Sequence, residues 1–260
     1  MNIKFIGTGN SAGIPVFGCD CSACNLARDD EKFVRHSGCS LQVNYGDELL
    51  LIDAGMVDFK QRYENEKKLK NILITHFHAD HVLGLLEARW GKNRNINVIA
   101  VDDSEGFTDL YKHPGIFNFS KKAIPFQTFT IGHEALKITP LPLHHSKPTV
   151  GYFISNDAGK NLTYLCDCGP IIPVETVNFL HEQENLDCLI IDSNFPPTEI
   201  DCRNHNNLIT ALENIDILSP QIAFLTHISH DLDAWLSENK NFILPENVRI
   251  ASDELVFNIK

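Results

Sequence analysis

The sequence predicts an α/β fold in which two β-sheets pack face to face and helices cover their outer surfaces, a four-layer αββα sandwich. Two observations indicate this arrangement. Short apolar runs typical of buried strands recur along all 260 residues, and the segments with helical periodicity between them are fewer. Periodicity alone leaves other α/β folds open.

The predicted strands are short runs rich in Val, Ile, Leu, Phe and Tyr, residue types that favour an extended and partly buried backbone. In chain order they cover residues 2–6, 41–45, 49–52, 72–75, 98–101, 136–140, 150–154, 162–165, 188–191, 222–225 and 254–259.

The predicted helices lie between these strands. Apolar residues recur at helical spacing from Val82 to Trp90 and from Val174 to Leu180, and further helices are expected at 208–217 and 232–236. We expect them to form the outer layers. The Lys-rich stretch 63–70 is interpreted as a solvated connection.

Length and composition favour one domain over residues 1–260, because 43% hydrophobic residues can bury one large core and no linker interrupts the chain. The chain opens directly into a predicted strand, without a signal peptide, and no apolar run approaches the roughly 20 residues of a membrane span. A cytoplasmic location without membrane attachment is therefore expected. In that reducing compartment the eight cysteines are expected to be free, metal-bound or catalytic rather than paired.

The formal charge of −12 argues against a general affinity for nucleic acid, which requires clustered Lys and Arg. Two divalent cations would nevertheless add about four positive charges locally, so that an anionic substrate could still enter a cleft of this acidic protein.

Potential metal ligands are concentrated in Thr75-His76-Phe77-His78-Ala79-Asp80-His81, which joins a predicted strand to a predicted helix. Alternate residues of an extended loop point the same way, so His76 and His78 can face one cation while Asp80 and His81 face a second. A lone histidine is usually a surface residue, but four ligand types within six positions at a strand end strongly favour a metal site.

Four residues cannot fill two coordination shells, so other strand ends must contribute. His145, Asp167 and His227 follow three of the predicted strands and are the candidates.

The pattern His-x-His-x-Asp-His resembles the metal motif of the metallo-β-lactamase superfamily, and Leu51-Ile52-Asp53-Ala54-Gly55 resembles another of its signatures. The resemblance implies the metallo-β-lactamase fold, and it implies that Asp53 supports the metal loop without binding metal itself. It also implies three protein ligands on each of two metals, with one residue bridging them. The first set is His76, His78 and His145, the second is Asp80, His81 and His227, and Asp167 is the bridge.

A second cluster of ligand types is Gly18-Cys19-Asp20-Cys21-Ser22-Ala23-Cys24, in a stretch expected to be an irregular loop that binds zinc around residues 19–24. Three thiolates need a fourth ligand for tetrahedral zinc, and His230 is the best candidate. Buried apolar cysteines and a redox sensor are the alternatives. The remaining cysteines lack metal-site spacing and are interpreted as buried small residues: Cys39, Cys166, Cys168, Cys188 and Cys202.

Further short motifs point to a narrower group. They are Arg89-Trp90-Gly91, Lys112-His113-Pro114-Gly115, Pro140-Leu141-Pro142-Leu143, His145-Ser146-Lys147, Arg203-Asn204-His205 and Leu225-Thr226-His227-Ile228-Ser229-His230. Together with the cysteines they resemble the PhnP family of phosphodiesterases, which accompanies bacterial carbon-phosphorus lyase. The resemblance implies one structural zinc held by Cys19, Cys21, Cys24 and His230. Cys166-Asp167-Cys168 departs from it, because a small hydroxyl residue is expected after the aspartate.

Two divalent cations activate water and stabilise the charge that builds on phosphoryl oxygens, which suits phosphoester hydrolysis. The missing role is an acid for the leaving oxygen. His205 is the candidate, because it matches a non-ligand histidine of the resembling family; the alternative is a capping or surface residue. Asp80 is assigned to the catalytic residues as well as to the metal ligands.

The resemblance implies hydrolysis of 5-phospho-α-D-ribose 1,2-cyclic phosphate to ribose 1,5-bisphosphate in phosphonate use. Another superfamily phosphodiesterase (tRNA 3′-processing or cyclic-nucleotide type), a thioester or β-lactam hydrolase, and a non-catalytic metal-binding protein are the alternatives. Mn or Zn, with Ni also suitable, would fill the active site. The expected partner is a small phosphodiester rather than nucleic acid, and a homodimer is one of the open oligomeric states.

Overall fold

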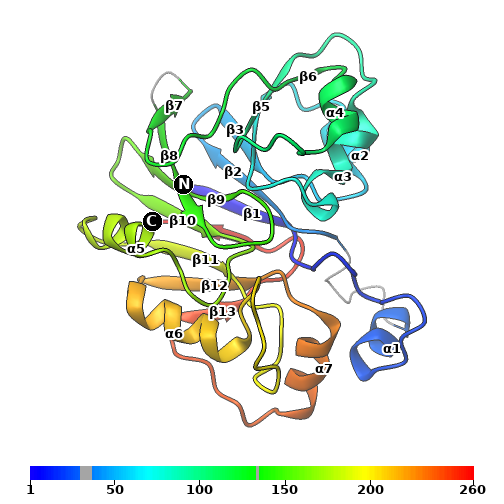
Figure 1. Cartoon of the computed structure of the whole chain (residues 1–260), viewed down its shortest axis with the longest axis vertical. Coiled ribbons are helices and arrows are strands. Elements are labelled where there is room, and N and C mark those ends of the chain that lie inside the picture. The colour runs from blue at the N-terminus through cyan, green and yellow to red at the C-terminus, as the bar shows by residue number, and fades with distance from the viewer. Residues whose placement is uncertain (30–36, 133–134) are drawn as a thin grey trace.

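Two sheets of seven strands each lie face to face in the computed structural model, which describes residues 1–29, 37–132 and 135–260. Helices cover the outer faces of both sheets, as Figure 1 shows, so the predicted αββα sandwich is confirmed. Within these described ranges, no helix is long and apolar enough to cross a membrane.

The first sheet combines antiparallel strands at one side with parallel strands at the other. Its spatial order is β14 (Val256–Asn258), β1 (Asn2–Gly7), β2 (Ser40–Tyr45), β3 (Glu48–Ile52), β4 (Leu69–Ile74), β5 (Ile96–Ala100) and β6 (Phe117–Asn118). Strands β3 to β6 run parallel to one another, and the others pair antiparallel.

The second sheet has the same mixed construction. Its order is β13 (Val248–Ile250), β12 (Ile222–Thr226), β11 (Cys188–Asp192), β10 (Asn161–Leu165), β9 (Thr149–Asn156), β8 (Leu136–Leu143) and β7 (Phe129–Ile131). Strand β7 pairs only with residues 136–138 of β8. Pro140 and Pro142 therefore lie where β8 has one strand neighbour, a position that tolerates the missing backbone donor.

Helices α2 (Phe59–Tyr63), α3 (Ala79–Ala88) and α4 (Thr108–Lys112) accompany the first sheet, and α5 (Val174–His181), α6 (Leu208–Leu218) and α7 (His230–Glu238) accompany the second. Each group buries an apolar cluster beneath it, and a third cluster fills the space between the sheets. Helix α1 (Ser22–Asp29) extends away from the layers beside α7 in Figure 1, where Ser22 Oγ lies 3.4 Å from Ser237 Oγ.

The structure corrects three local predictions. Helix α3 begins at Ala79 rather than near Val82, so Asp80 and His81 lie in its first turn. The stretch 63–70 is not simply a solvated connection, because Tyr63 and Leu69 are buried and belong to α2 and β4. The cysteine motif is not wholly irregular either, since α1 begins at Ser22 and includes Cys24.

The parallel strands bring the predicted ligands together. Parallel neighbours end at the same edge of a sheet. The loops after β3, β4, β10 and β12 hold Asp53, residues 75–78, Asp167 and His227, and Asp192 is the last residue of β11. The candidate site is thus built at strand ends from both sheets.

Candidate metal centre

The ligand-rich loop is short because β4 ends at Ile74 and α3 begins at Ala79. His78 caps α3 with an extended backbone (φ −76°, ψ 153°), which leaves His76 and His78 on the strand side of the helix. Asp80 occupies the first helical turn, where the exposed backbone N–H groups favour a negative charge.

The first group of ligand atoms consists of three histidine nitrogens and one carboxylate oxygen. His78 Nδ1 lies 2.8 Å from His76 Nε2 and 3.1 Å from His145 Nε2. Asp167 Oδ2 lies 3.4 Å from His76 Nε2 and 3.5 Å from His145 Nε2. All four atoms face one another within 4.8 Å, as the ligands of a single cation do.

The second group adjoins the first through Asp167. Asp80 Oδ2 lies 3.4 Å from His227 Nε2 and 3.6 Å from His81 Nε2. Asp167 Oδ1 approaches His227 Nε2 to 3.1 Å, and Oδ2 lies 3.4 Å from His81 Nε2. The carboxylate of Asp167 therefore reaches both groups, which is the position predicted for it.

The chemistry of these atoms fits divalent cations. Imidazole nitrogens and carboxylate oxygens suit Zn, Mn and Ni. Among the described residues, His81 Nε2 is a buried nitrogen without a hydrogen-bond partner, although it is directed at the two carboxylates. A buried polar atom without a partner costs about 1–3 kcal/mol, and a coordinated cation would remove that cost.

A buried network fixes the ligand rings from behind. Asp53 accepts hydrogen bonds from the Thr75 backbone N–H at 2.9 Å and the Thr75 hydroxyl at 3.0 Å, and its Oδ2 lies 2.9 Å from His81 Nδ1. The backbone carbonyl of Asn204 lies 2.9 Å from His145 Nδ1. Such contacts on the far nitrogen direct the other nitrogen to the metal. Asp53 was predicted to have this role, whereas Asn204 was not.

Tight backbone turns place three of these residues. Asp53, Asp167 and His227 each follow a strand and have positive φ values of 57°, 58° and 58°. This left-handed conformation is uncommon for residues other than glycine, and it clusters at functional sites.

Gly55, two residues after Asp53, is required for a different reason. A Cβ at this position would lie 1.9 Å from the carbonyl oxygen of Asp80.

The charges of the site shift several pKa values in opposite directions. Burial opposes protonation of His81, but the Asp167 and Asp53 carboxylates outweigh it and raise the His81 pKa well above its usual value. Burial likewise opposes protonation of His227, whose pKa the Asp167 carboxylate nevertheless raises to about 10. Burial and the nearby charge of His81 lower the pKa of His76 well below its usual value.

His205 lies beside the ligand groups. Its ring stacks on that of His227 with centroids 4.8 Å apart and an interplanar angle of 15°. One of its nitrogens is within 4.8 Å of ligand atoms of Asp167 and His227, and Nδ1 faces Asp192 Oδ2 at 3.3 Å. Asp192 is fully buried and was not predicted as a site residue. Its place in the sequence could have indicated a site residue, because Asp192 follows the predicted strand 188–191 much as Asp167 follows the predicted strand 162–165.

The cysteine motif forms a separate cluster. Cys19, Cys21, Cys24 and His230 place one ligand atom each within 4.8 Å of the others, with His230 Nδ1 3.5 Å from Cys19 Sγ and 3.4 Å from Cys21 Sγ. Four atoms of these types suit tetrahedral zinc.

The prediction that the remaining cysteines are buried is confirmed for Cys39, Cys166, Cys168 and Cys188. It is wrong for Cys202, which is half-exposed, because it lies in a surface segment where its thiol donates to the carbonyl of Glu199 at 3.4 Å.

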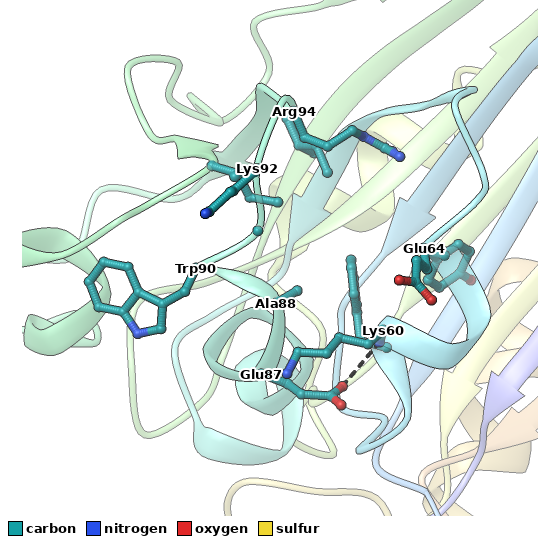
Figure 2. A pocket seen from close by; sticks show the side chains of 12 residues that line it. Lys60, Glu64, Glu87, Ala88, Trp90, Lys92 and Arg94 are labelled. Carbon is teal, nitrogen blue, oxygen red and sulfur yellow. Dashed lines mark hydrogen bonds between the residues drawn. The ribbon is translucent and has the colours of Figure 1, made fainter.

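A cavity of about 390 Å³ lies away from both clusters, between α2 and the end of α3, and none of the ligand residues lines it. Figure 2 shows charged side chains around it, including Lys60, Glu64, Glu87 and Arg94. The candidate chemistry is therefore at the strand ends and not in this cavity.

Comparison with known proteins gives the same picture of the fold. A family model described as a beta-lactamase superfamily domain matches residues 49–228. The crystal structure of a new diphosphatase from the PhnP family superposes with a TM-score of 0.78 at 26% identity, covering 100% of this chain and 98% of that one.

Two curated relatives match less completely. An octanoyltransferase of Porphyromonas gingivalis is 25% identical over 98% of this chain and 51% of that protein. A ribonuclease Z of Azobacteroides pseudotrichonymphae is 27% identical over 45% of this chain and 46% of that protein. The chain thus spans about half the length of the curated relatives it matches.

Replacing one thiolate tests the zinc cluster. Cys21→Ser should lower the metal content by about one ion per chain and Tm by about 5 °C or more, because structural zinc contributes directly to folding. Metal analysis and thermal unfolding measure both. Cys202→Ser is the matched control and should change neither. An unaltered metal content in Cys21→Ser would contradict the assignment.

Metal binding at the histidine sites should release protons. The raised pKa values favour protonated His81 and His227 in the absence of metal, so binding should displace protons. Affinity should therefore rise with pH up to about 10, the pKa of His227. Calorimetric titration with Mn²⁺ in buffers of different ionisation enthalpy measures this release, and identical heats in all buffers would refute it.

Proposed function

The chain belongs to the beta-lactamase superfamily, and on that premise we propose that it is a dinuclear metal-dependent phosphodiesterase. The observation that carries the proposal is the combination of two adjacent ligand groups, which share Asp167, with a further histidine, His205, that lies beside Asp167 and His227 and is not needed to complete either group. The groups supply positions for two metals, and His205 supplies a proton donor.

Seven residues would hold the two ions. His76, His78 and His145 would bind the first, Asp80, His81 and His227 would bind the second, and Asp167 would bridge them. Bound there, two divalent cations supply a nucleophile derived from water at neutral pH and stabilise negative charge on phosphoryl oxygens. Buried Asp53 would keep the His81 ring in the orientation that binding needs.

His205 would act on the leaving group. Asp192 faces Nδ1, so Nε2 is the nitrogen free to donate a proton to the departing oxygen. The stacking of His205 on His227 restricts the ring to the neighbourhood of the second ligand group.

Within this class we propose a small cyclic phosphodiester, specifically 5-phospho-α-D-ribose 1,2-cyclic phosphate, opened to ribose 1,5-bisphosphate in phosphonate use. Its support is the PhnP-like set of motifs together with the likeness, over the whole chain, to a diphosphatase of that family. The formal charge of −12 disfavours a nucleic-acid substrate.

Hydrolysis of an acyl thioester is a second candidate. The observation that favours it is the match of nearly the whole chain to half of a protein named an octanoyltransferase. A nucleophile activated by two metals attacks carbonyl carbon as well as phosphorus.

A substrate panel on the metal-loaded protein tests these proposals. With Mn²⁺ or Zn²⁺ the protein should hydrolyse bis(p-nitrophenyl) phosphate, and it should turn over the cyclic ribosyl phosphate faster than a 2′,3′-cyclic nucleotide. Hydrolysis of an octanoyl thioester alone would favour the second candidate. Three metals per chain without hydrolysis of any phosphodiester would overturn the phosphodiesterase proposal.

Removal of the proposed acid should slow the reaction without removing metal. His205→Ala is expected to lower kcat on a substrate with a poor leaving group by roughly 10²- to 10⁴-fold, because the departing oxygen then leaves without a proton. Steady-state kinetics and metal analysis measure the two effects. His113→Ala, an exposed histidine near Trp90, is the control. Unchanged turnover in His205→Ala would remove His205 from the mechanism.

A further inference from the structure

The thiol of Cys168 has a specific partner. Cys168 directly follows Asp167, yet its side chain contacts Asp192, with Sγ donating to Oδ1 at 3.0 Å. Its backbone N–H donates to the same oxygen at 3.1 Å. Both side chains are fully buried, so neither contact competes with solvent. This is the position at which the sequence departs from its resembling family.

The other half of the Asp192 carboxylate faces the proposed acid. Oδ2 accepts a hydrogen bond from the Asn206 backbone N–H at 3.1 Å and lies 3.3 Å from His205 Nδ1. Asn206 Nδ2 donates to Oδ1 at 3.2 Å and lies 3.2 Å from Cys168 Sγ. The carboxylate is therefore bound on one edge by the segment that contains Asp167 and on the other by the segment that contains His205.

We propose that Cys168 is a positioning residue for His205 and acts through Asp192. Its S–H···Oδ1 contact restrains the carboxylate, which keeps Oδ2 at 3.3 Å from His205 Nδ1. The proposal rests on the proposed function in one respect, namely that His205 donates a proton during turnover.

The thiol matters because the carboxylate has no other side-chain anchor on that edge besides Asn206, among the described contacts. Cys168→Ala removes the thiol donor and leaves space beside Oδ1. The carboxylate is then held only by the backbone N–H groups of Cys168 and Asn206 and by Asn206 Nδ2, and it can shift relative to His205. Cys168→Ser keeps a donor of similar size. Because the Cβ–O bond of serine is shorter than the Cβ–S bond of cysteine, the hydroxyl lies farther from Asp192 Oδ1 than the thiol does. The loss should therefore affect proton transfer more than substrate binding.

Kinetics on a double-mutant cycle tests the route through His205. Cys168→Ala should lower kcat by about 5- to 30-fold with KM and metal content nearly unchanged, and Cys168→Ser should restore most of the activity. In a His205→Ala background, Cys168→Ala should cause little further loss, because residues that act through one group are not additive. The same fold-loss in both backgrounds would overturn the proposal.

A spectroscopic readout tests the proposal without turnover. The ¹⁵N shifts of the His205 ring report which nitrogen carries the proton. In the wild type Nδ1 should be protonated; Cys168→Ala should shift the population towards the Nε2–H tautomer, and Cys168→Ser should reverse that shift. Cys188→Ala, which deletes a buried thiol at the start of β11, is the matched control and should leave the ring unchanged.

Failure of the proposed function and failure of the positioning role give different results. A wild-type protein that hydrolyses no phosphodiester overturns the proposed function, while the ring shifts still test the contact between Cys168, Asp192 and His205. An unchanged His205 spectrum in Cys168→Ala overturns the positioning role, whatever the activity of the wild type.

Discussion

The buried carboxylate of Asp167 is the group on which the rest of this structure depends. Its two oxygens lie within 3.5 Å of ring nitrogens from His76, His81, His145 and His227. Burial alone would raise the pKa of Asp167, but the charges of His227 and His81 lower it well below its usual value, so it remains an anion. A buried anion is stable only with compensating positive charge and hydrogen bonds. Because its partners follow strands of both sheets, that compensation requires both sheets to be in place.

Most of the fold could be predicted, and so could the residues that the fold brings together as candidate ligands, and for the same reason. Every predicted strand was a short apolar run, and Asp53, Asp167 and His227 each lie within two positions of the end of such a run. The elements and residues that were not predicted are either very short or are defined by tertiary contacts. Strands β6, β7 and β13 and helices α2 and α4 have five residues or fewer, too few for a period to be recognised. Asp192 was missed although it follows a predicted strand as Asp167 does, because the resemblance assigned it no role, and only the folded chain places His205 against it.

Family-like motifs do not all carry chemistry. Arg89-Trp90-Gly91 and Lys112-His113-Pro114-Gly115 lie outside the ligand groups, and they hold α4 against the end of α3. The Arg89 carbonyl accepts a hydrogen bond from the Ile116 N–H at 2.9 Å, and Arg89 pairs with Asp109 of α4. Gly115, at φ +59°, is required there because a Cβ would lie 1.7 Å from that carbonyl. These motifs support the layer from which the metal loop enters α3.

The left-handed backbone at Asp53, Asp167 and His227 also restricts how this chain can evolve. Glycine and asparagine adopt that conformation at little cost, whereas β-branched residues do so only with strain. A descendant that no longer needed these three side chains would therefore accumulate Gly or Asn at these positions and could retain the sandwich. Substitution by Val or Ile would damage the fold and the candidate site together. The residues found at these three strand ends would therefore distinguish a lineage that lost the candidate site from one that lost the fold.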